Sequence, residues 1–287
     1  MTLETLGLHV LNGITFGALL FLLASGFTLI FGLMRITNMS HGGLYLVGGY
    51  IGLTVLGRTG NFWVALITAG LGVALLGLAI ERVLLRPVRN RILPEVLVTL
   101  GLAFILGDLA LAIWGGDPQT IRVPGVLSGS VSLLGLTYPT FRLFMVLVGV
   151  LTAAGLWFLQ HRTLLGAVIR AGVDDAEMVD AMGIDIKTVF NRVFALGAAL
   201  AGVAGLLGGA FLALYPGADS EILLLAVVVV ILGGPGSLAG AVAGSLLVGL
   251  IDAFATALVP DLLYFTLFAP MVVILAWRPH GLLGRAG

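Results

Sequence analysis

The sequence predicts an all-α protein built as a polytopic membrane helical bundle, and three observations lead to this prediction. Of the 287 residues, 60% are hydrophobic and only 10% are charged, whereas a soluble domain carries about 25% charged residues. Apolar runs of about 20 residues, long enough to span roughly 30 Å of hydrocarbon as helices, recur along the chain. The 42 glycines suit helices that approach one another closely within a membrane.

Other features of the composition exclude several classes of function. The formal net charge is +0, so nothing indicates a nucleic-acid partner. The chain has no cysteine and therefore no disulfide or thiolate site. It lacks the phosphate-binding pattern G-x-x-x-x-G-K followed by Ser or Thr, and its one lysine is Lys187. Because no paired carboxylates, nucleophile motif or metal-ligand cluster stands out, we predict that the chain is not an enzyme and holds no metal or cofactor.

We expect a single transmembrane domain over residues 1–287, with about eight membrane segments. The first run lacks a basic start and a clear cleavage site, which favours a retained helix over a signal peptide. Glycine interrupts two segments: one follows the polar break at 34–43 and continues to residue 56, and the other contains GGPGS at 233–237. The remaining spans are expected at 8–31, 62–80, 93–113, 141–159, 189–213 and 260–277.

The distribution of arginine and lysine predicts which parts of the chain are cytoplasmic. The loop at 82–92, the segment 161–192 and the C-terminal tail are rich in these residues, whereas the Gly/Pro/Ser/Thr-rich loop at 115–140 contains only Arg122. We therefore place the first three inside and the N-terminus outside. Residues 222–254 must then leave and return to the same side as two short helices or a re-entrant hairpin; a single broken crossing is the alternative.

A weak internal symmetry indicates an inverted repeat. The Gly/Ala-rich spans 8–31 and 189–213 are each followed by a glycine-broken segment, and the two spans are expected to run in opposite directions. In many transporters, interrupted helices in inverted repeats mark the transport route. Such breaks occur at membrane depth only where they are buried in protein or line a wet cavity. The alternative is a chance likeness between glycine-rich helices.

The segment 161–192 is too polar to cross a bilayer, and we interpret it as a docking segment. Asp174 is expected to cap a short helix that has Glu177 at its third position, and Gly183 is expected to end that helix. The charged residues of the segment are Arg162, Arg170, Asp174, Asp175, Glu177, Asp180, Asp185, Lys187 and Arg192.

The faces of this segment suggest two short helices. Met178, Val179 and Met182 share one face of the capped helix, with acidic residues opposite. The preceding piece, 162–172, has apolar residues at helical spacing and suits a helix that lies on the inner leaflet; these residues are Leu164, Leu165, Val168 and Ile169. An ordinary solvated loop with a surface helix is the alternative.

Polar residues within the membrane segments are the other candidates. Asn38, Ser40 and His41 stand at a helix break, where they either line a substrate path or satisfy freed backbone groups. Asn12 is expected to bond across helices or to line the path. The GGPGS glycines suit a tight turn between packed helices. Two acids, Asp108 and Asp252, are interpreted as lying near the membrane interface, although acids within the membrane are often functional.

Several stretches in a fixed order resemble one family. They are Asn12-Gly13 through Phe31-Gly32, ITNMSHG from Ile36, ERVLLRPVR at 81–89, TLLGAVIRAGVDDAEMVDAMG from Thr163 to Gly183, LGGPGSLAGAVAG at 232–244 and RPHGLLGR at 278–285. Together they resemble the bacterial ABC-importer permeases of the branched-chain amino acid (leucine/isoleucine/valine) class, and the smaller of the two permease subunits in particular. The Asn-Met-Ser-His-Gly stretch and Pro235 depart from the residues that the family often has there.

The resemblance implies a transport subunit in the bacterial inner membrane. It implies two separate ATP-binding cassette subunits, a second permease chain, an external substrate-binding protein and branched-chain or related amino acids as substrates. The implied coupling residues are Asp174, Asp175, Glu177, Met178, Ala181, Met182 and Gly183, and the candidate substrate pathway comprises Asn12, Asn38, Ser40, His41, Gly233, Gly234, Gly236 and Ser237. The competing hypothesis is a self-contained secondary carrier or channel coupled to ions through Asp108, Asp252 or His41.

Overall fold

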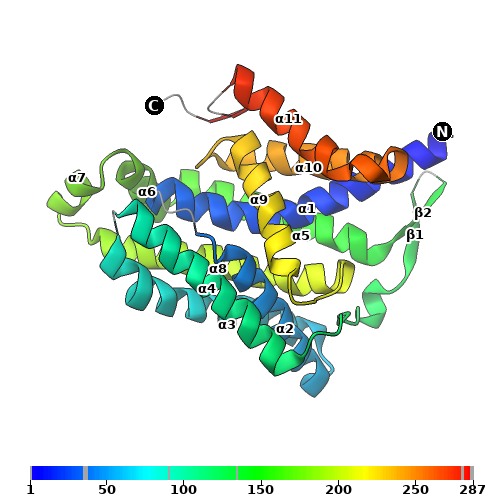
Figure 1. The fold of residues 1–287 in the computed structure, drawn as a ribbon, viewed down its shortest axis with the longest axis horizontal. Helices are drawn as coiled ribbons and strands as arrows, with labels where there is room; N and C mark the ends of the chain where they lie inside the picture. Colours follow the sequence, from blue (N-terminus) through cyan, green and yellow to red (C-terminus); the bar gives the residue numbers. More distant parts are fainter. Residues whose placement is uncertain (1, 35–37, 90, 134, 279–280, 285–287) are drawn as a thin grey trace.

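The chain folds into a helical bundle, seen in a computed structural model that describes residues 2–34, 38–89, 91–133, 135–278 and 281–284 (Figure 1). Ile36, Thr37 and Arg285, which belong to the sequence motifs, lie outside the described residues. The helices are α1 (Leu3–Met34), α2 (His41–Thr59), α3 (Phe62–Ile80), α4 (Ile92–Trp114), α5 (Thr140–Arg162), α6 (Leu164–Asp174), α7 (Ala176–Ala181), α8 (Ile186–Phe211), α9 (Ala218–Gly233), α10 (Leu238–Leu258) and α11 (Leu263–Trp277).

Six of these helices are long and apolar enough to cross a membrane, counted over the described residues: α1, α3 with its extension to Val88, α4, α5, α8 and α10. The shorter α2, α9 and α11 complete the set of apolar helices. The prediction of a polytopic all-α membrane protein is thereby confirmed. The loop at 115–140 adds one feature that the sequence did not predict, a two-stranded antiparallel hairpin of β1 (Ser130–Leu133) and β2 (Leu136–Pro139).

The two ends of the bundle differ in what they carry (Figure 1). One end holds the start of α1 and the β1–β2 hairpin, and the other holds α6 and α7. We name them the outer end and the inner end, because the arginine-poor loop and the arginine-rich segment are expected on those sides of the membrane.

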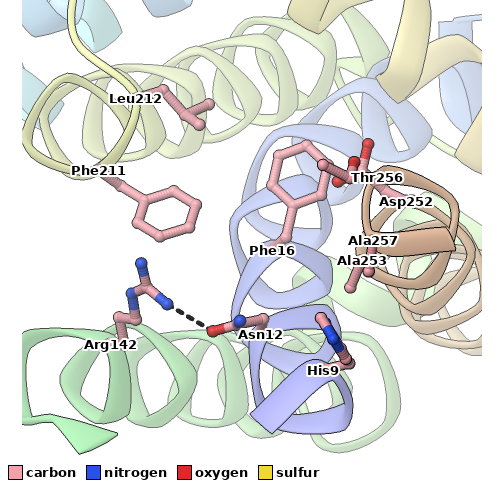
Figure 2. Close-up of a pocket in the computed structure, with 10 residues that line it drawn as sticks. All are labelled: His9, Asn12, Phe16, Arg142, Phe211, Leu212, Asp252, Ala253, Thr256 and Ala257. Carbon is pink, nitrogen blue, oxygen red and sulfur yellow. Dashed lines mark hydrogen bonds between the residues drawn. The ribbon is translucent and has the colours of Figure 1, made fainter. Parts of the chain in front are cut away.

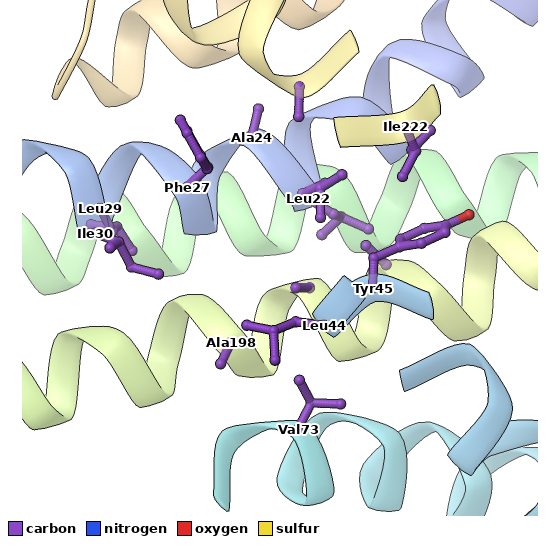
Figure 3. Packing of buried hydrophobic residues seen from close by; sticks show 14 of the residues in the cluster. Leu22, Ala24, Phe27, Leu29, Ile30, Leu44, Tyr45, Val73, Ala198 and Ile222 are labelled. Carbon is purple, nitrogen blue, oxygen red and sulfur yellow. The ribbon is translucent and has the colours of Figure 1, made fainter. Parts of the chain in front are cut away.

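The centre of the bundle is the crossing of α1 and α8, where backbones touch. A Cβ atom added to Gly26 would lie 2.5 Å from the carbonyl oxygen of Gly197, so a larger residue does not fit without movement. Figure 3 shows the apolar layer around this crossing, with Phe27 and Ile30 of α1, Ala198 of α8 and neighbours from α2, α3 and α9. Close contact through small residues is how membrane helices gain van der Waals energy.

The packing agrees with an inverted repeat that pairs α1–α4 with α8–α11. Helix α10 packs along α1 as α3 packs along α8, helix α9 contacts α1 as α2 contacts α8, and α11 lies on α9 as α4 lies on α2. The first helices of the two halves are antiparallel, since the Phe16 ring lies beside that of Phe211 while Gly26 meets Gly197. An inverted repeat requires that orientation.

This pairing corrects one detail of the predicted repeat. The counterpart of the break before α2 is the turn between α8 and α9, and the GGPGS turn corresponds to the turn between α2 and α3. The GGPGS turn and the α2–α3 turn are built alike. In the α2–α3 turn, Gly60 with φ of 65° precedes the N-cap Asn61, and in the GGPGS turn, Gly234 with φ of 100° precedes the N-cap Ser237.

The chain leaves the outer end after α8, turns between α9 and α10 at the inner end and returns to the outer end along α10, which excludes the single broken crossing. The end of α8 lies beside Phe16 near the start of α1. Helix α10 runs antiparallel to α1, because residue numbers rise along α10 as those of their partners in α1 fall. The contacts are Gly236 with Gly32, Ser245 with Gly17 and Leu250 with Gly13.

Candidate functional site

The break before α2 is a fully buried polar cluster. The Asn38 Oδ1 atom accepts hydrogen bonds from the backbone N–H and the hydroxyl of Ser40, at 3.1 and 2.6 Å. His41 Nε2 lies 3.1 Å from the carbonyl oxygen of Leu23, and its ring packs edge-on against Phe27. All three predicted side chains are therefore brought together at one place, and all three are inaccessible to solvent in this conformation.

Two atoms of this cluster have no partner among the residues that the structure describes: Asn38 Nδ2 and His41 Nδ1. A buried polar group without a hydrogen bond is unfavourable and is uncommon in folded proteins. The Ser40 side chain also makes no capping bond to α2. The cluster thus retains hydrogen-bonding capacity that the backbone groups freed at the break do not use.

Helix α9 begins directly against the start of α2. A Cβ atom added to Gly42 would lie 2.2 Å from the carbonyl oxygen of Asp219, so only glycine fits there. The Asp219 carboxylate is buried and accepts a hydrogen bond from the backbone N–H of Gly217 at 3.2 Å. Two helix N-termini, each with a partial positive charge, therefore meet inside the bundle. Asp219 was not among the predicted site residues, because it stands in a short polar stretch between two apolar runs.

The GGPGS residues form a tight turn at the inner end of α1. Gly234 and Gly236 have positive φ angles of 100° and 76°, and Ser237 Oγ accepts a hydrogen bond from the backbone N–H of Gly240. The C-terminal tail covers the end of α9, where Leu282 N–H and Leu283 N–H donate to the carbonyl oxygens of residues 232 and 233. The positive φ angles of these glycines agree with the predicted tight turn. Their place in a substrate pathway stays a prediction.

Asn12 lies in a separate pocket of about 320 Å³ at the outer end (Figure 2). Its Oδ1 atom accepts hydrogen bonds from Arg142 and from the Tyr138 hydroxyl. Asn12 therefore bonds across helices, as one of its two predicted roles required. The pocket is lined by His9, Asn12, Phe16, Arg142, Phe211, Leu212, Asp252, Ala253, Thr256 and Ala257.

The pocket brings together residues that the sequence separates. Arg142 was not selected, although an arginine at the start of an apolar run was a signal for it. Of the two acids that were considered, Asp108 is exposed on α4, whereas Asp252 lines this pocket.

The docking segment contains the expected short helix, but the cap is shifted by one residue. Asp175, not Asp174, is the N-cap of α7, and its Oδ1 atom accepts a hydrogen bond from the Met178 N–H at 2.9 Å. Asp174 is instead the last residue of α6. Gly183 follows the helix with φ of +82°, as the prediction required.

The faces of α6 and α7 differ from those predicted. Val179 is buried, while Met178 and Met182 are 59% and 71% exposed, so the three do not share one face. Glu177, Ala181 and Gly183 are exposed as well. Ile169, Leu165 and Val168 of α6 pack against the protein, whereas Leu164 is 87% exposed, so a place for α6 on the inner leaflet stays a prediction.

A second capped helix start follows the docking segment. Asp185 caps α8 by accepting hydrogen bonds from the backbone N–H groups of Lys187 and Thr188 and from the Thr188 hydroxyl. The Thr188 hydroxyl is the largest cause that lowers the pKa of Asp185 below its ordinary value. The start of α8 is therefore fixed by side-chain hydrogen bonds a few residues after α7 ends.

The fold and these sites define a class: a multi-pass membrane transport protein whose half-helices meet inside an inverted repeat. The family model described as "Branched-chain amino acid transport system / permease component" matches residues 9–275. The chain therefore belongs to the branched-chain amino acid transport permease family.

Curated relatives agree with this assignment. The chain is 31% identical over 96% of its length, and 95% of the relative's, to the high-affinity branched-chain amino acid transport system permease protein BraD of Pseudomonas aeruginosa. It is 28% identical to LivH of Escherichia coli K12 with the same coverage. A putative glucose ABC transporter permease protein, TsgC13 of Haloferax volcanii, is 29% identical over 68% of the chain and 61% of the relative. No solved structure gives a significant match.

Proposed function

We propose that this chain is the transmembrane permease subunit of an ATP-driven importer for branched-chain or related amino acids, located in the bacterial inner membrane. The observation that carries the proposal is the match to permease components of branched-chain amino acid transport systems over residues 9–275. Relatives matched over nearly the whole chain are named as permeases for these amino acids. An external binding protein would deliver the substrate at the outer end.

Energy would reach the chain through α7. The sequence holds no phosphate-binding loop, so ATP hydrolysis is assigned to two separate ATP-binding cassette subunits. Exposed methionine side chains suit a partner's apolar groove because they are long, flexible and polarisable. Met178 and Met182 provide such a surface between the exposed acids Glu177 and Asp180. The coupling residues of this proposal are Asp174, Asp175, Glu177, Met178, Ala181, Met182 and Gly183.

The substrate would pass the junction of α2 and α9. Half-helices whose N-termini meet inside a bundle are a recurring way to build a transport site. Asn38 and His41 supply unused hydrogen-bonding groups at that junction. Since the cluster is buried, this conformation is closed there, and transport requires the two halves of the repeat to move apart. A second permease chain would complete the pore.

The proposal is tested with the double variant Met178→Glu/Met182→Glu in the complex with its ATP-binding cassette subunits, second permease and binding protein. We expect normal amounts of the variant in the membrane, because both side chains are exposed. Uptake of L-leucine and co-purification of the cassette subunits are expected to fall at least about tenfold, because charges enter an apolar contact. Val126→Glu, which places the same charge on another exposed apolar residue, in the outer loop, is the matched control.

The competing carrier hypothesis predicts a different result. Uptake by the unaltered chain would then follow an ion gradient without ATP, and the double variant would transport normally. Either finding would contradict the proposed function.

A further inference from the structure

The outer pocket contains a cation and an anion that do not neutralise each other. Arg142 extends from the start of α5 and Asp252 from the last part of α10, and both line the same cavity (Figure 2). Among the described residues, Arg142 and Asp252 form no ion pair with one another. Charged side chains in membrane segments are unfavourable and are usually paired or functional. This arrangement therefore needs an explanation beyond packing.

Arg142 is held in place by its neighbours but is not saturated. One guanidinium nitrogen donates to Asn12 Oδ1, and the guanidinium carbon lies 5.2 Å from the centre of the Phe211 ring. A guanidinium has five N–H donors in a planar fork that matches a carboxylate. No other acceptor of Arg142 is present among the described residues, so donors remain available on the pocket side.

Asp252 supplies the opposite charge. Its carboxylate makes no hydrogen bond or ion pair to another described residue, and Thr256 adds a hydroxyl one helical turn further along α10. A carboxylate accepts hydrogen bonds from an ammonium group in several directions. Phe16 of α1 and Phe211 of α8, with ring centroids 6.5 Å apart, form an apolar wall of the same cavity.

We propose that this pocket is an entry site for a zwitterionic α-amino acid. Arg142 receives the α-carboxylate, Asp252 receives the α-ammonium group, and the phenylalanine wall receives an aliphatic side chain. The volume of about 320 Å³ lies at the lower limit of ligand pockets, which suits a small ligand. The inference rests on the proposed function for the direction of transport, but the binding of the zwitterion can be measured by itself.

The test measures binding of three probes to the full-length chain in lipid nanodiscs. The probes are L-leucine, leucinamide, which lacks the carboxylate, and 4-methylpentanoate, which lacks the ammonium group. The unaltered chain is expected to bind leucine at least about tenfold more tightly than either of the other two, because each charged hydrogen bond contributes separately.

Each pocket variant should lose the preference for leucine over one of the two analogues and keep the preference over the other. Arg142→Gln is expected to bind leucine and leucinamide equally, and Asp252→Asn to bind leucine and 4-methylpentanoate equally. The charge-conserving variants Arg142→Lys and Asp252→Glu should restore part of the preference, which separates charge recognition from a loss of folding. Arg122→Gln and Asp261→Asn, which alter exposed charges outside the pocket, serve as matched controls.

Four results would overturn the inference. The unaltered chain could bind all three probes equally or bind none, or both pocket variants could keep the full preference for leucine. When the variants are assembled with their partners, they could also lose the second permease or the binding protein while leucine binding is unchanged, which would assign the two charges to a subunit contact. Absence of ATP-driven leucine uptake by the complete system is a separate result, and it would refute the proposed function whatever the binding data show.

Discussion

The break before α2 and the break between α9 and α10 both let the chain change direction within the bundle, but they use different atoms. The first is built from the buried polar side chains of Asn38, Ser40 and His41. The second is built from the backbone freedom of Gly234 and Gly236 and is covered by the C-terminal tail. One break carries unused hydrogen-bonding groups, and the other satisfies its groups locally.

The two halves of the chain share an arrangement of helices, but they do not share the polar side chains at their breaks. In the inverted repeat, the break before α2 corresponds to the turn after α8. The helices that follow them, α2 and α9, touch at Gly42 and Asp219. The polar groups that could handle a substrate gather at that junction. The glycine turn lies at the inner end of α1, where Gly234 and Gly236 supply the positive φ angles of the turn. Substitutions at the junction should therefore affect uptake, and substitutions at the turn should affect stability.

The largest effect is expected for Gly42→Ala. The added Cβ atom would lie 2.2 Å from a backbone carbonyl oxygen, so α2 and α9 must separate. We expect a loss of about 3 kcal/mol or more in stability and loss of uptake, measured by thermal unfolding of the purified chain and by leucine transport. Gly57→Ala on the same helix, where a Cβ atom meets nothing within 4 Å, should match the unaltered chain. Equal behaviour of the two variants would contradict the tight junction.

His41→Phe is expected to have the next largest effect and to act mainly on transport. The new ring keeps the packing against Phe27 but loses the bond to the Leu23 carbonyl oxygen and the unpartnered Nδ1 atom. We expect uptake per folded molecule to fall at least about tenfold while stability falls by about 1 kcal/mol. If uptake declines only in proportion to the folded protein, His41 has a purely structural role.

Gly236→Ala should destabilise the chain without changing transport by the molecules that fold. A non-glycine residue at φ of 76° costs about 1–2 kcal/mol, which a shift in unfolding temperature would report. Pro235→Ala, at the exposed neighbouring position, should stay within about 0.5 kcal/mol of the unaltered chain. A change in substrate preference for Gly236→Ala would place the turn in the pathway after all.

Ser237→Ala should give the smallest effect. It removes the N-cap bond to Gly240, and such a loss is worth about 1 kcal/mol. Ser237→Thr keeps the hydroxyl and should restore most of the stability in the same unfolding measurement. A larger loss, or failure of threonine to rescue, would mean that the hydroxyl serves more than the cap.

The sequence predicted the membrane helices well because each of them is a continuous local pattern. Single residues were harder to place where two neighbours could perform one task, as with Asp174 and Asp175 at the start of α7. The outer pocket could not be predicted, because Arg142 and Asp252 meet only after four helices have packed. The α2–α9 junction was half predicted: the polar residues before α2 were identified, while Asp219 becomes distinctive only through its contact with Gly42.

The contact between Gly26 and Gly197 has a consequence for the speed of movement. Side chains that interlock must change rotamer before two helices can rotate past one another. At this crossing two bare backbones touch, so a small rotation of α1 against α8 requires no rotamer change at the point of contact. We therefore expect side chains elsewhere along α1 and α8, and not this backbone contact, to limit how fast the two helices rotate past one another.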